Sequence, residues 1–353
     1  MRMLVGMSGG VDSSVAAALL RDEGHDVAGV TLKLWGGESD TGCCSVADVD
    51  DARWAADRLG IDHHVFNFGT EFDRHVVDPY VSAHAQGRTP NPCVECNRHV
   101  KFDALLERAV ALGFDAVATG HHARIVERPD GTRRVARGAD AAKDQSYVVG
   151  VLGQRQLARI RFPIGGRTKG DVRRLAAELD LATATKPDSQ EVCFIRRGEG
   201  RRGFLDRRLA TTPGTVVDTT GAVVGAVAAV ELVTVGQRRG IGAPGGHEPR
   251  YVLDVDIAAA RVTVGSEAEL ATTVTPVGPW TWTAEPIAGR LLAQASAHGA
   301  ATPVDVDPEE GAVRWVAPRR RVAPGQLVVL YDGDEVVGSA LAGSSSTPSS
   351  SPG

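Results

Sequence analysis

The residues best suited to chemistry near the amino terminus form a short loop rich in glycine and serine. Residues 7–14 read Met-Ser-Gly-Gly-Val-Asp-Ser-Ser, between an apolar run and a strong helix former. Gly9 and Gly10 permit positive φ angles and the close approach of a ligand. Where such a turn opens a helix, backbone N–H groups converge on an anion. Asp12 suits a phosphate site if a divalent cation such as Mg²⁺ bridges its carboxylate to the phosphates.

Two common phosphate-binding motifs do not match this loop. No Gly-Lys-Ser/Thr follows it, as it would in a Walker A loop. The third glycine of the dinucleotide-binding pattern is also missing. The loop resembles the pyrophosphate loop, Ser-Gly-Gly-x-Asp-Ser, of enzymes that cleave ATP to AMP and pyrophosphate and so adenylate a substrate oxygen. A plain helix cap without a ligand is the alternative.

Two cysteines three residues apart form a second reactive group. Cys93 and Cys96 follow two prolines, in Thr-Pro-Asn-Pro-Cys-Val-Glu-Cys-Asn at 89–97, where a helix is expected to begin. A helix N-terminus lowers the pKa of a thiol and favours the thiolate. Cys193 lies far away in the sequence. Three interpretations compete: half of a structural zinc site lacking its second ligand pair, inert thiols, and sulfur chemistry between Cys96 and Cys193.

Composition narrows the class of protein. The chain has 353 residues, of which 42% are hydrophobic and 24% charged, enough for two or three domains. A net charge of −5 gives no overall basic field, so any RNA site must be a local patch. No membrane span or signal peptide is expected. The five cysteines then favour a reducing, cytoplasmic location. Cys43 and Cys44 are given no role.

Strands and helices alternate along the first half of the chain. Apolar runs predict strands at 3–5, 27–32, 65–68 and 115–120, and helical periodicity predicts helices at 15–20, 46–59, 71–86, 102–112, 154–160 and 169–179, with a hairpin at 123–137. This order predicts an α/β fold built on a doubly wound parallel sheet. Ligands of such sheets gather at the carboxyl ends of the strands. Residues 8–13, Leu32 and Gly120 are therefore expected to lie near one another.

The pattern changes at about residue 205, where short β-rich runs separated by glycine and proline begin. We expect a catalytic ATP-binding domain at 1–204, a small central β-rich domain at 205–271 and a C-terminal β-barrel-like domain at 272–342. The tail at 343–353 is rich in serine, proline and glycine and is expected to be disordered.

Six short motifs occur together in this chain. They are the pyrophosphate loop, Asn-Pro-x-x-x-Cys-Asn at 91–97, Gly-His-His at 120–122, Lys-Asp-Gln-Ser at 143–146, Cys-Phe-Ile at 193–195 and Val-Gly-Gln-Arg-Arg-Gly at 235–240. Together they resemble the bacterial tRNA-specific 2-thiouridylases, over residues 1 to about 342. The resemblance implies a sulfurtransferase that replaces the 2-oxygen of the wobble uridine of tRNA with sulfur. It also implies ATP and Mg²⁺, with a cysteine desulfurase or a sulfur-relay carrier as the sulfur source.

The resemblance further implies roles for individual residues. ATP would bind at Gly6, Met7, Ser8, Gly9, Gly10, Val11, Asp12, Ser13, Leu32 and Gly120. The uridine oxygen would attack the α-phosphate, and Cys193 would hold the incoming sulfur as a persulfide. Cys96 would be the nucleophile that attacks this persulfide, closing a Cys96–Cys193 disulfide. Contacts to tRNA would come from Asn91, Pro92, Cys93, His121, Lys143, Asp144, Gln145 and Gln326, the first three at the flipped-out base.

Two departures from the family pattern leave alternatives open. Cys93 stands where some members carry aspartate, and with Cys96 and Cys193 it makes three cysteines, enough to hold an iron–sulfur cluster with one open iron. The RNA contact expected at residues 297–299 is missing. The basic run at 319–321 is a candidate for phosphate contacts in its place, or an ordinary exposed turn. Other functions that remain open are a different adenylating synthetase with the same loop and a non-catalytic tRNA- or sulfur-carrier protein.

Overall fold

The computed structural model describes residues 1–34, 46–188, 192–195, 198–242 and 249–344 of the chain. Its residues divide into two compact units. The first comprises 1–77, 92–198 and 334–336, and the second comprises 78–91, 199–333 and 337–353. Cys43, Cys44 and all but the first two residues of the predicted tail lie outside the described residues.

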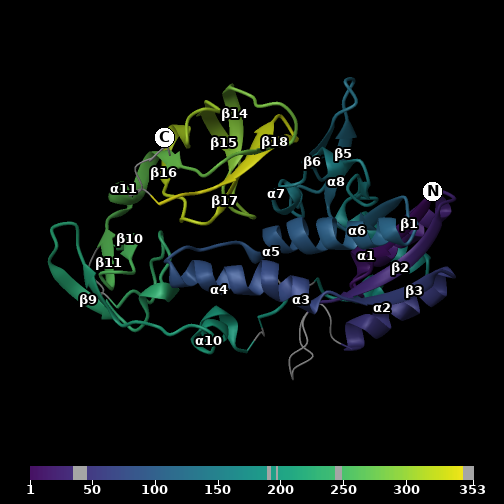
Figure 1. Cartoon of the computed structure of the whole chain (residues 1–353), viewed down its shortest axis with the longest axis horizontal. Helices are drawn as coiled ribbons and strands as arrows, with labels where there is room; N and C mark the ends of the chain where they lie inside the picture. Colours follow the sequence, from purple (N-terminus) through teal and green to yellow (C-terminus); the bar gives the residue numbers. More distant parts are fainter. Residues whose placement is uncertain (35–45, 189–191, 196–197, 243–248, 345–353) are drawn as a thin grey trace. The chain divides into compact units, whose positions relative to one another are not determined.

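A five-stranded parallel sheet forms the centre of the first unit, in the order β3-β2-β1-β4-β7. Figure 1 labels β1, β2 and β3 of this sheet. The strands are β1 (Arg2–Gly6), β2 (Asp26–Lys33), β3 (Asp62–Asn67), β4 (Ala116–Thr119) and β7 (Ile160–Arg161). The predicted α/β fold class is confirmed. Strand β7 corrects the helix predicted at 154–160, because that helix ends at Leu157 and buried Ile160 pairs with Val117 of β4.

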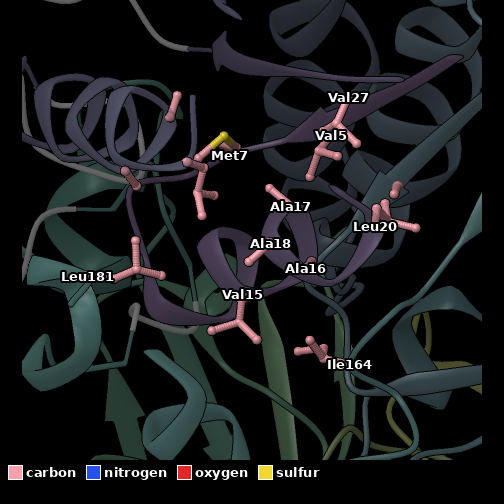
Figure 2. Close-up of a cluster of buried hydrophobic side chains, with 14 of the residues drawn as sticks. Val5, Met7, Val15, Ala16, Ala17, Ala18, Leu20, Val27, Ile164 and Leu181 are labelled. Carbon is pink, nitrogen blue, oxygen red and sulfur yellow. The ribbon is translucent and has the colours of Figure 1, made fainter. Parts of the chain in front are cut away.

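The first unit also contains α-helices. They are α1 (Val11–Asp22), α2 (Val46–Leu59), α3 (Gly69–Phe72), α5 (Pro92–Glu95), α6 (Leu105–Ala111), α7 (Ser146–Val149), α8 (Gln154–Leu157) and α9 (Lys169–Glu178). Figure 2 shows Ala17 of α1 on the side of the helix that faces Val5 of β1, and Val15 on the opposite side, toward Ile164 and Leu181. Alanine favours helix and adds little bulk. The small side chains therefore let α1 lie close to the sheet that carries the glycine loop.

Two predicted helices differ from those in the structure. The helix predicted at 102–112 begins earlier, at Pro92, because proline suits the first turn of a helix. Between α5 and α6 the backbone forms a π-helix, η2 (Cys96–Ala104). The helix predicted at 71–86 is likewise divided into α3, the π-helix η1 (Asp73–Val77) and α4 (Asp78–Ala85). π-Helical turns are rare and often occur at functional sites.

The remaining elements of the first unit are short. They are the hairpin β5 (Ala123–Glu127) and β6 (Arg133–Arg137), which was predicted, and the 3₁₀-helix η3 (Ala182–Thr185).

The second unit is mostly β-structure, as predicted. One sheet, in the order β10-β11-β8-β9, consists of β8 (Gly214–Val217), β9 (Val223–Val227), β10 (Tyr251–Asp256) and β11 (Arg261–Gly265). A second, antiparallel set consists of β12 (Ala271–Pro276), β13 (Thr281–Trp282), β14 (Gly289–Gln294), β15 (Thr302–Val306), β16 (Ala312–Arg320), β17 (Leu327–Asp332) and the greater part of β18 (Glu335–Leu341). Its helical elements are α4, α10 (Gly200–Asp206), α11 (Glu267–Leu270) and the 3₁₀-helix η4 (Val230–Leu232). Among the helices described, none is both long and apolar enough to cross a membrane.

Candidate active site

The glycine loop lies at the carboxyl edge of the parallel sheet. Gly6, the last residue of β1, pairs with Val30 of β2 on one side and with Thr119 of β4 on the other. The chain that leaves β1 therefore runs between the end of β2, which carries Leu32, and Gly120 just after β4. The predicted ATP-binding residues thus follow three neighbouring strands at one edge.

Hydroxyl groups hold the loop in shape. The Ser13 hydroxyl donates to Gly10 O at 3.1 Å and accepts from the backbone N–H of Ser8 at 3.2 Å. The Ser14 hydroxyl also donates to Gly10 O, at 3.0 Å. At the entrance to the loop, the Thr31 hydroxyl donates to Met7 O at 2.8 Å. The turn is therefore ordered before any ligand arrives.

Two glycines of the site are required by close packing. Gly9 has φ +69°, and a Cβ atom there would lie 2.2 Å from Asp48 O. A Cβ atom on Gly120 would lie 2.6 Å from both Asp12 C and Ser13 N. These contacts are with backbone, which moves less easily than a side chain. Gly120 therefore lets the loop that follows β4 approach the first turn of α1.

The substitution Gly120→Ala tests this close approach. Overpacking against a rigid neighbour costs about 1–3 kcal/mol, so we expect a lower melting temperature and weaker ATP binding. Gly166→Ala is the matched control, because no atom lies within 4 Å of the added Cβ and its φ is not positive. Thermal unfolding and ATP titration of both variants measure the difference. Equal behaviour of the two variants would contradict the role given to Gly120.

Asp12 is the centre of an ion-pair network that sequence reasoning did not find. Its carboxylate accepts from Lys169 Nζ at 2.7 Å and lies 3.2 Å from His122 Nε2. Lys169 Nζ also lies 2.9 Å from Asp188, which in turn binds Lys143 Nζ at 2.8 Å. The loop, the Gly-His-His motif, the Lys-Asp-Gln-Ser motif and the start of α9 are joined by these side chains.

The network keeps its carboxylates charged. Burial raises the pKa of Asp12, but hydrogen bonds from His122 and Lys169 lower it more, so the net shift is downward. Burial likewise raises the pKa of Asp188, yet Lys143 and Lys169 together hold it well below its usual value. Lys169, whose side chain is only 12% exposed, is therefore a fixed cation beside the glycine loop.

Two residues of the first unit that are predicted to contact tRNA, His121 and Gln145, make contacts within the protein. The His121 ring is buried between Phe102 and Phe162, 2.7 Å from the Thr119 hydroxyl, and burial lowers its pKa well below the usual value. Gln145 Oε1 accepts from the backbone N–H of His122 at 2.9 Å.

Asp144 organises its own loop. It accepts from Arg137 at 2.8 Å and from the backbone N–H groups of Gly138 and Ser146 at 2.9 and 3.0 Å. Of the Lys-Asp-Gln triplet, only Lys143 has a largely exposed charged group, with 43% of its side chain accessible.

The thiols predicted to react lie in the same unit as the glycine loop. Cys96 is the first residue of η2 and is buried, while Cys93 in α5 and Cys193 are half-buried. The Phe194 ring packs edge-on against Phe72 of α3 at 5.6 Å, and α3 contacts η2. The chain segment that carries Cys193 and the helix that carries Cys96 therefore pack on one short helix. Ser189, Gln190 and Glu191, which precede Cys193 in the chain, lie outside the described residues.

No cysteine cluster suited to a metal is present in the part of the chain that the structure describes. Cys93, Cys96 and Cys193 are thiols there, and no group of three or more His, Cys, Asp or Glu side chains is placed to hold an ion. In this arrangement the three cysteines do not fit an iron–sulfur cluster. A single carboxylate such as Asp12 does fit Mg²⁺, which is usually bound by one or two carboxylates together with substrate phosphates.

In the second unit the fold brings Gln326 to the segment that leads to Asn91. The Gln326 amide donates to Thr89 O, and the backbone N–H of Thr89 donates to Pro324 O at 2.7 Å. Two of the predicted RNA contacts, far apart in the sequence, are thereby linked through Thr89.

The fold and the loop together define a class: an α/β nucleotide-binding unit with a pyrophosphate-type loop, joined to β-rich domains. Three family models match consecutive parts of the chain. They are described as the tRNA methyl transferase HUP domain (residues 1–197), the tRNA methyl transferase PRC-barrel domain (202–266) and the aminomethyltransferase beta-barrel domain (275–342).

Curated relatives match nearly the whole chain. A protein of Streptomyces avermitilis is 47% identical, covering 96% of this chain and 94% of its own length, and one of Frankia casuarinae is 49% identical, covering 96% and 97%. A protein of Roseiflexus castenholzii is 45% identical, covering 96% and 98%. All three are named tRNA-specific 2-thiouridylase MnmA. The chain belongs to the tRNA-specific 2-thiouridylase family, which confirms the predicted resemblance.

Proposed function

We propose that this protein uses ATP to replace the 2-oxygen of the wobble uridine of tRNA with sulfur. Membership of its family supports the class of reaction, which is an ATP-dependent thiolation of tRNA by a sulfurtransferase. The observation that supports it most is the grouping within one unit of the glycine loop, the fixed cation Lys169, and the two chain segments bearing Cys96 and Cys193. A cytoplasmic location fits both the substrate and the reduced thiols.

ATP would bind along the loop from Gly6 to Ser13, with Leu32 and Gly120 beside the adenosine. The ordered turn presents its backbone N–H groups and the start of α1 to the phosphates. Lys169, anchored by Asp12 at 2.7 Å, would sit beside these phosphates as a point charge. Asp12 would hold Mg²⁺, which would supply further charge neutralisation.

The first chemical step forms one bond and breaks another. The 2-oxygen of uridine attacks the α-phosphorus of ATP, the bond to the β-phosphate oxygen breaks, and pyrophosphate leaves. The product is a base whose 2-oxygen carries AMP. Lys169 would stabilise the charge that develops on the departing pyrophosphate, because a preorganised cation needs no reorientation during the reaction.

Sulfur then replaces the activated oxygen. The terminal sulfur of a Cys193 persulfide, loaded by a cysteine desulfurase or a relay carrier, attacks C2, and AMP leaves with the original oxygen. The Cys96 thiolate attacks Cys193 Sγ and breaks its bond to the transferred sulfur, which stays on C2. The electron pair of that bond goes to the departing sulfur, and a Cys96–Cys193 disulfide forms. An external thiol reductant must then restore the two thiols.

The remaining assignments concern RNA and domain limits. Asn91, Pro92 and Cys93 are proposed to contact the flipped-out base. His121, Lys143, Asp144, Gln145 and Gln326 are proposed to contact other parts of the tRNA. The proposed domains are 1–204, 205–271 and 272–342.

The function is tested by mass analysis of tRNA incubated with the protein, ATP, Mg²⁺, a cysteine desulfurase and cysteine. We expect 2-thiouridine at the wobble position and pyrophosphate release that depends on tRNA. Pyrophosphate release that instead depends on a small amine or acid, without tRNA, would indicate a different adenylating synthetase.

The iron–sulfur version of the reaction has a separate test. The protein is purified without oxygen, and its colour, iron content and thiolation activity are measured. Because the described cysteines form no metal-binding group, we expect a colourless, iron-free and fully active sample. Activity that rises in proportion to bound iron would contradict the persulfide mechanism.

A further inference from the structure

The second unit contains an open cavity that the proposed reaction does not use. It measures about 540 Å³ and is lined by Arg201, Thr234, Gln237, Arg238 and Arg239. Three of these five residues carry a guanidinium group. Gln237, Arg238 and Arg239 belong to the Val-Gly-Gln-Arg-Arg-Gly motif, to which no role has been given so far.

The three guanidinium charges are not neutralised within the described part of the chain. Arg201 donates to the neutral oxygens Leu232 O at 3.1 Å and Thr234 Oγ1 at 3.2 Å. No carboxylate of the described residues forms an ion pair with it or with exposed Arg238 and Arg239. Like charges gathered without counter-ions repel one another, so an anion in the cavity would relieve this repulsion.

The basic run at 319–321 offers a contrast within the same unit. Arg319 lies over the Trp315 ring at 4.1 Å, Arg320 pairs with Glu267 at 2.5 Å, and Arg321 donates to Glu269 O at 3.2 Å. Each of these three side chains thus contacts a ring, a carboxylate or a backbone oxygen of the protein. Arg320 therefore has an acidic partner, whereas none of the three cavity arginines has one among the residues that the structure describes.

The loop that presents Arg238 and Arg239 is held by its neighbours. Gln237 Oε1 accepts from the backbone N–H of Thr234 at 3.1 Å, and Gln237 Nε2 donates to Arg239 O at 2.7 Å. The backbone of Gln237 accepts from the N–H of Val252 at 2.9 Å. A loop fixed in this way loses little conformational entropy when a ligand binds. The two guanidinium groups are thus presented on a preorganised support.

We infer that this cavity binds a phosphate of the RNA backbone, with Arg238 and Arg239 as the main ligands and Arg201 at its wall. The planar guanidinium fork matches phosphate oxygens in a bidentate way. The inference rests on the proposed function, because it assumes a tRNA substrate. It also supplies a local basic patch on a chain whose net charge is −5.

The open form of the cavity favours a polymer over a small free anion. Small-molecule sites usually enclose most of their ligand's surface, whereas Arg238 and Arg239 are exposed. A backbone phosphate needs only one contacting face, since the rest of the polymer is bound elsewhere. Such contacts position an RNA without reading its sequence.

The test compares two double variants of the full-length protein. Arg238→Gln with Arg239→Gln removes two charges at the cavity. Arg290→Gln with Arg314→Gln removes two charges from exposed arginines that pair with Asp305 and Glu310. Thermal unfolding checks that both variants are folded. The dissociation constant for tRNA is measured at several salt concentrations, and inorganic phosphate at millimolar concentration is titrated by calorimetry.

For the cavity variant we expect tRNA affinity to fall roughly tenfold, as for the loss of charge-assisted hydrogen bonds. The slope of log K against log salt should become shallower by about 1 for each lost phosphate contact. The control variant should keep both values near those of the wild type, and inorganic phosphate should show no saturable binding.

If the wild type binds and thiolates tRNA but the cavity variant keeps its affinity and salt slope, this inference alone is overturned. Saturable phosphate binding that the cavity variant loses without any change in tRNA affinity would assign the cavity to a small anion instead. A wild type that binds no tRNA would overturn the proposed function, and the inference with it.

Discussion

Cys193→Ser is expected to lose 2-thiolation by at least roughly 10³-fold, as enzymes do when their nucleophile is removed. Serine has nearly the same size but cannot carry a persulfide sulfur. Adenylation of the base does not involve this thiol, so tRNA-dependent pyrophosphate release should continue. The measurement is 2-thiouridine per tRNA by mass spectrometry, alongside pyrophosphate in the same reaction. Thiolation near the wild-type rate would exclude a persulfide at this position.

The variant Cys96→Ser should be blocked at a later step of the reaction, after sulfur has attacked C2. Without Cys96 the bond between Cys193 Sγ and the transferred sulfur is not broken by the protein. We expect tRNA to remain joined to the protein through a disulfide that an added thiol reductant cleaves. Cys93→Ser is the comparison variant. The persulfide route does not use this thiol, and serine keeps a side chain of similar size at the proposed contact with the base, so activity should stay within a few-fold. A Cys93→Ser variant as inactive as Cys193→Ser would favour the iron–sulfur alternative.

Lys169→Met is expected to slow tRNA-dependent pyrophosphate release by about 10²-fold, the usual effect of removing one preorganised electrostatic group. Methionine keeps most of the length and apolar stem of lysine but removes the charge that Asp12 holds at 2.7 Å. Lys169→Arg should restore part of the rate, because the charge is kept. The rate is measured at saturating ATP, and ATP affinity is measured separately without tRNA.

Lys143→Met is the matched control for this experiment. Lys143 shares the partner Asp188 with Lys169, but it makes no ion pair with Asp12 and its side chain is more exposed. We expect its ATP affinity to match that of the wild type. If Lys143→Met and Lys169→Met weaken ATP binding equally, the cation at the loop is not the source of the effect.

Local patterns in the sequence were sufficient for much of the fold. The periodicity of 46–59 predicted α2 with the bounds it has in the structure, and the apolar runs predicted β1, β2 and β4. Each of these depends on residues close in sequence. Strand β7 was missed because two residues carry no alternation, and only its pairing with β4 makes it a strand.

In the candidate site, too, features made of consecutive residues could be predicted, whereas contacts between distant residues could not. The glycine loop was recognisable because its residues are consecutive. The contacts of Asp12 with His122 and Lys169 were not, because the partners stand 110 and 157 residues away. Nothing local distinguishes Lys169 from other lysines at a helix start. His121 shows the opposite case. Its place in a motif suggested a contact with tRNA, whereas its ring is buried against Phe102 of η2 and Phe162, which are distant in sequence.

The most direct test of the central claim follows the uridine oxygen. A tRNA labelled with ¹⁸O at the 2-position of the wobble uridine is incubated with the protein, unlabelled ATP, Mg²⁺ and the sulfur source. If the base is adenylated at this oxygen and sulfur then displaces AMP, each 2-thiouridine formed should be matched by one AMP carrying ¹⁸O. Thiolated tRNA accompanied by unlabelled AMP, with the label in water or phosphate, would contradict the adenylated intermediate.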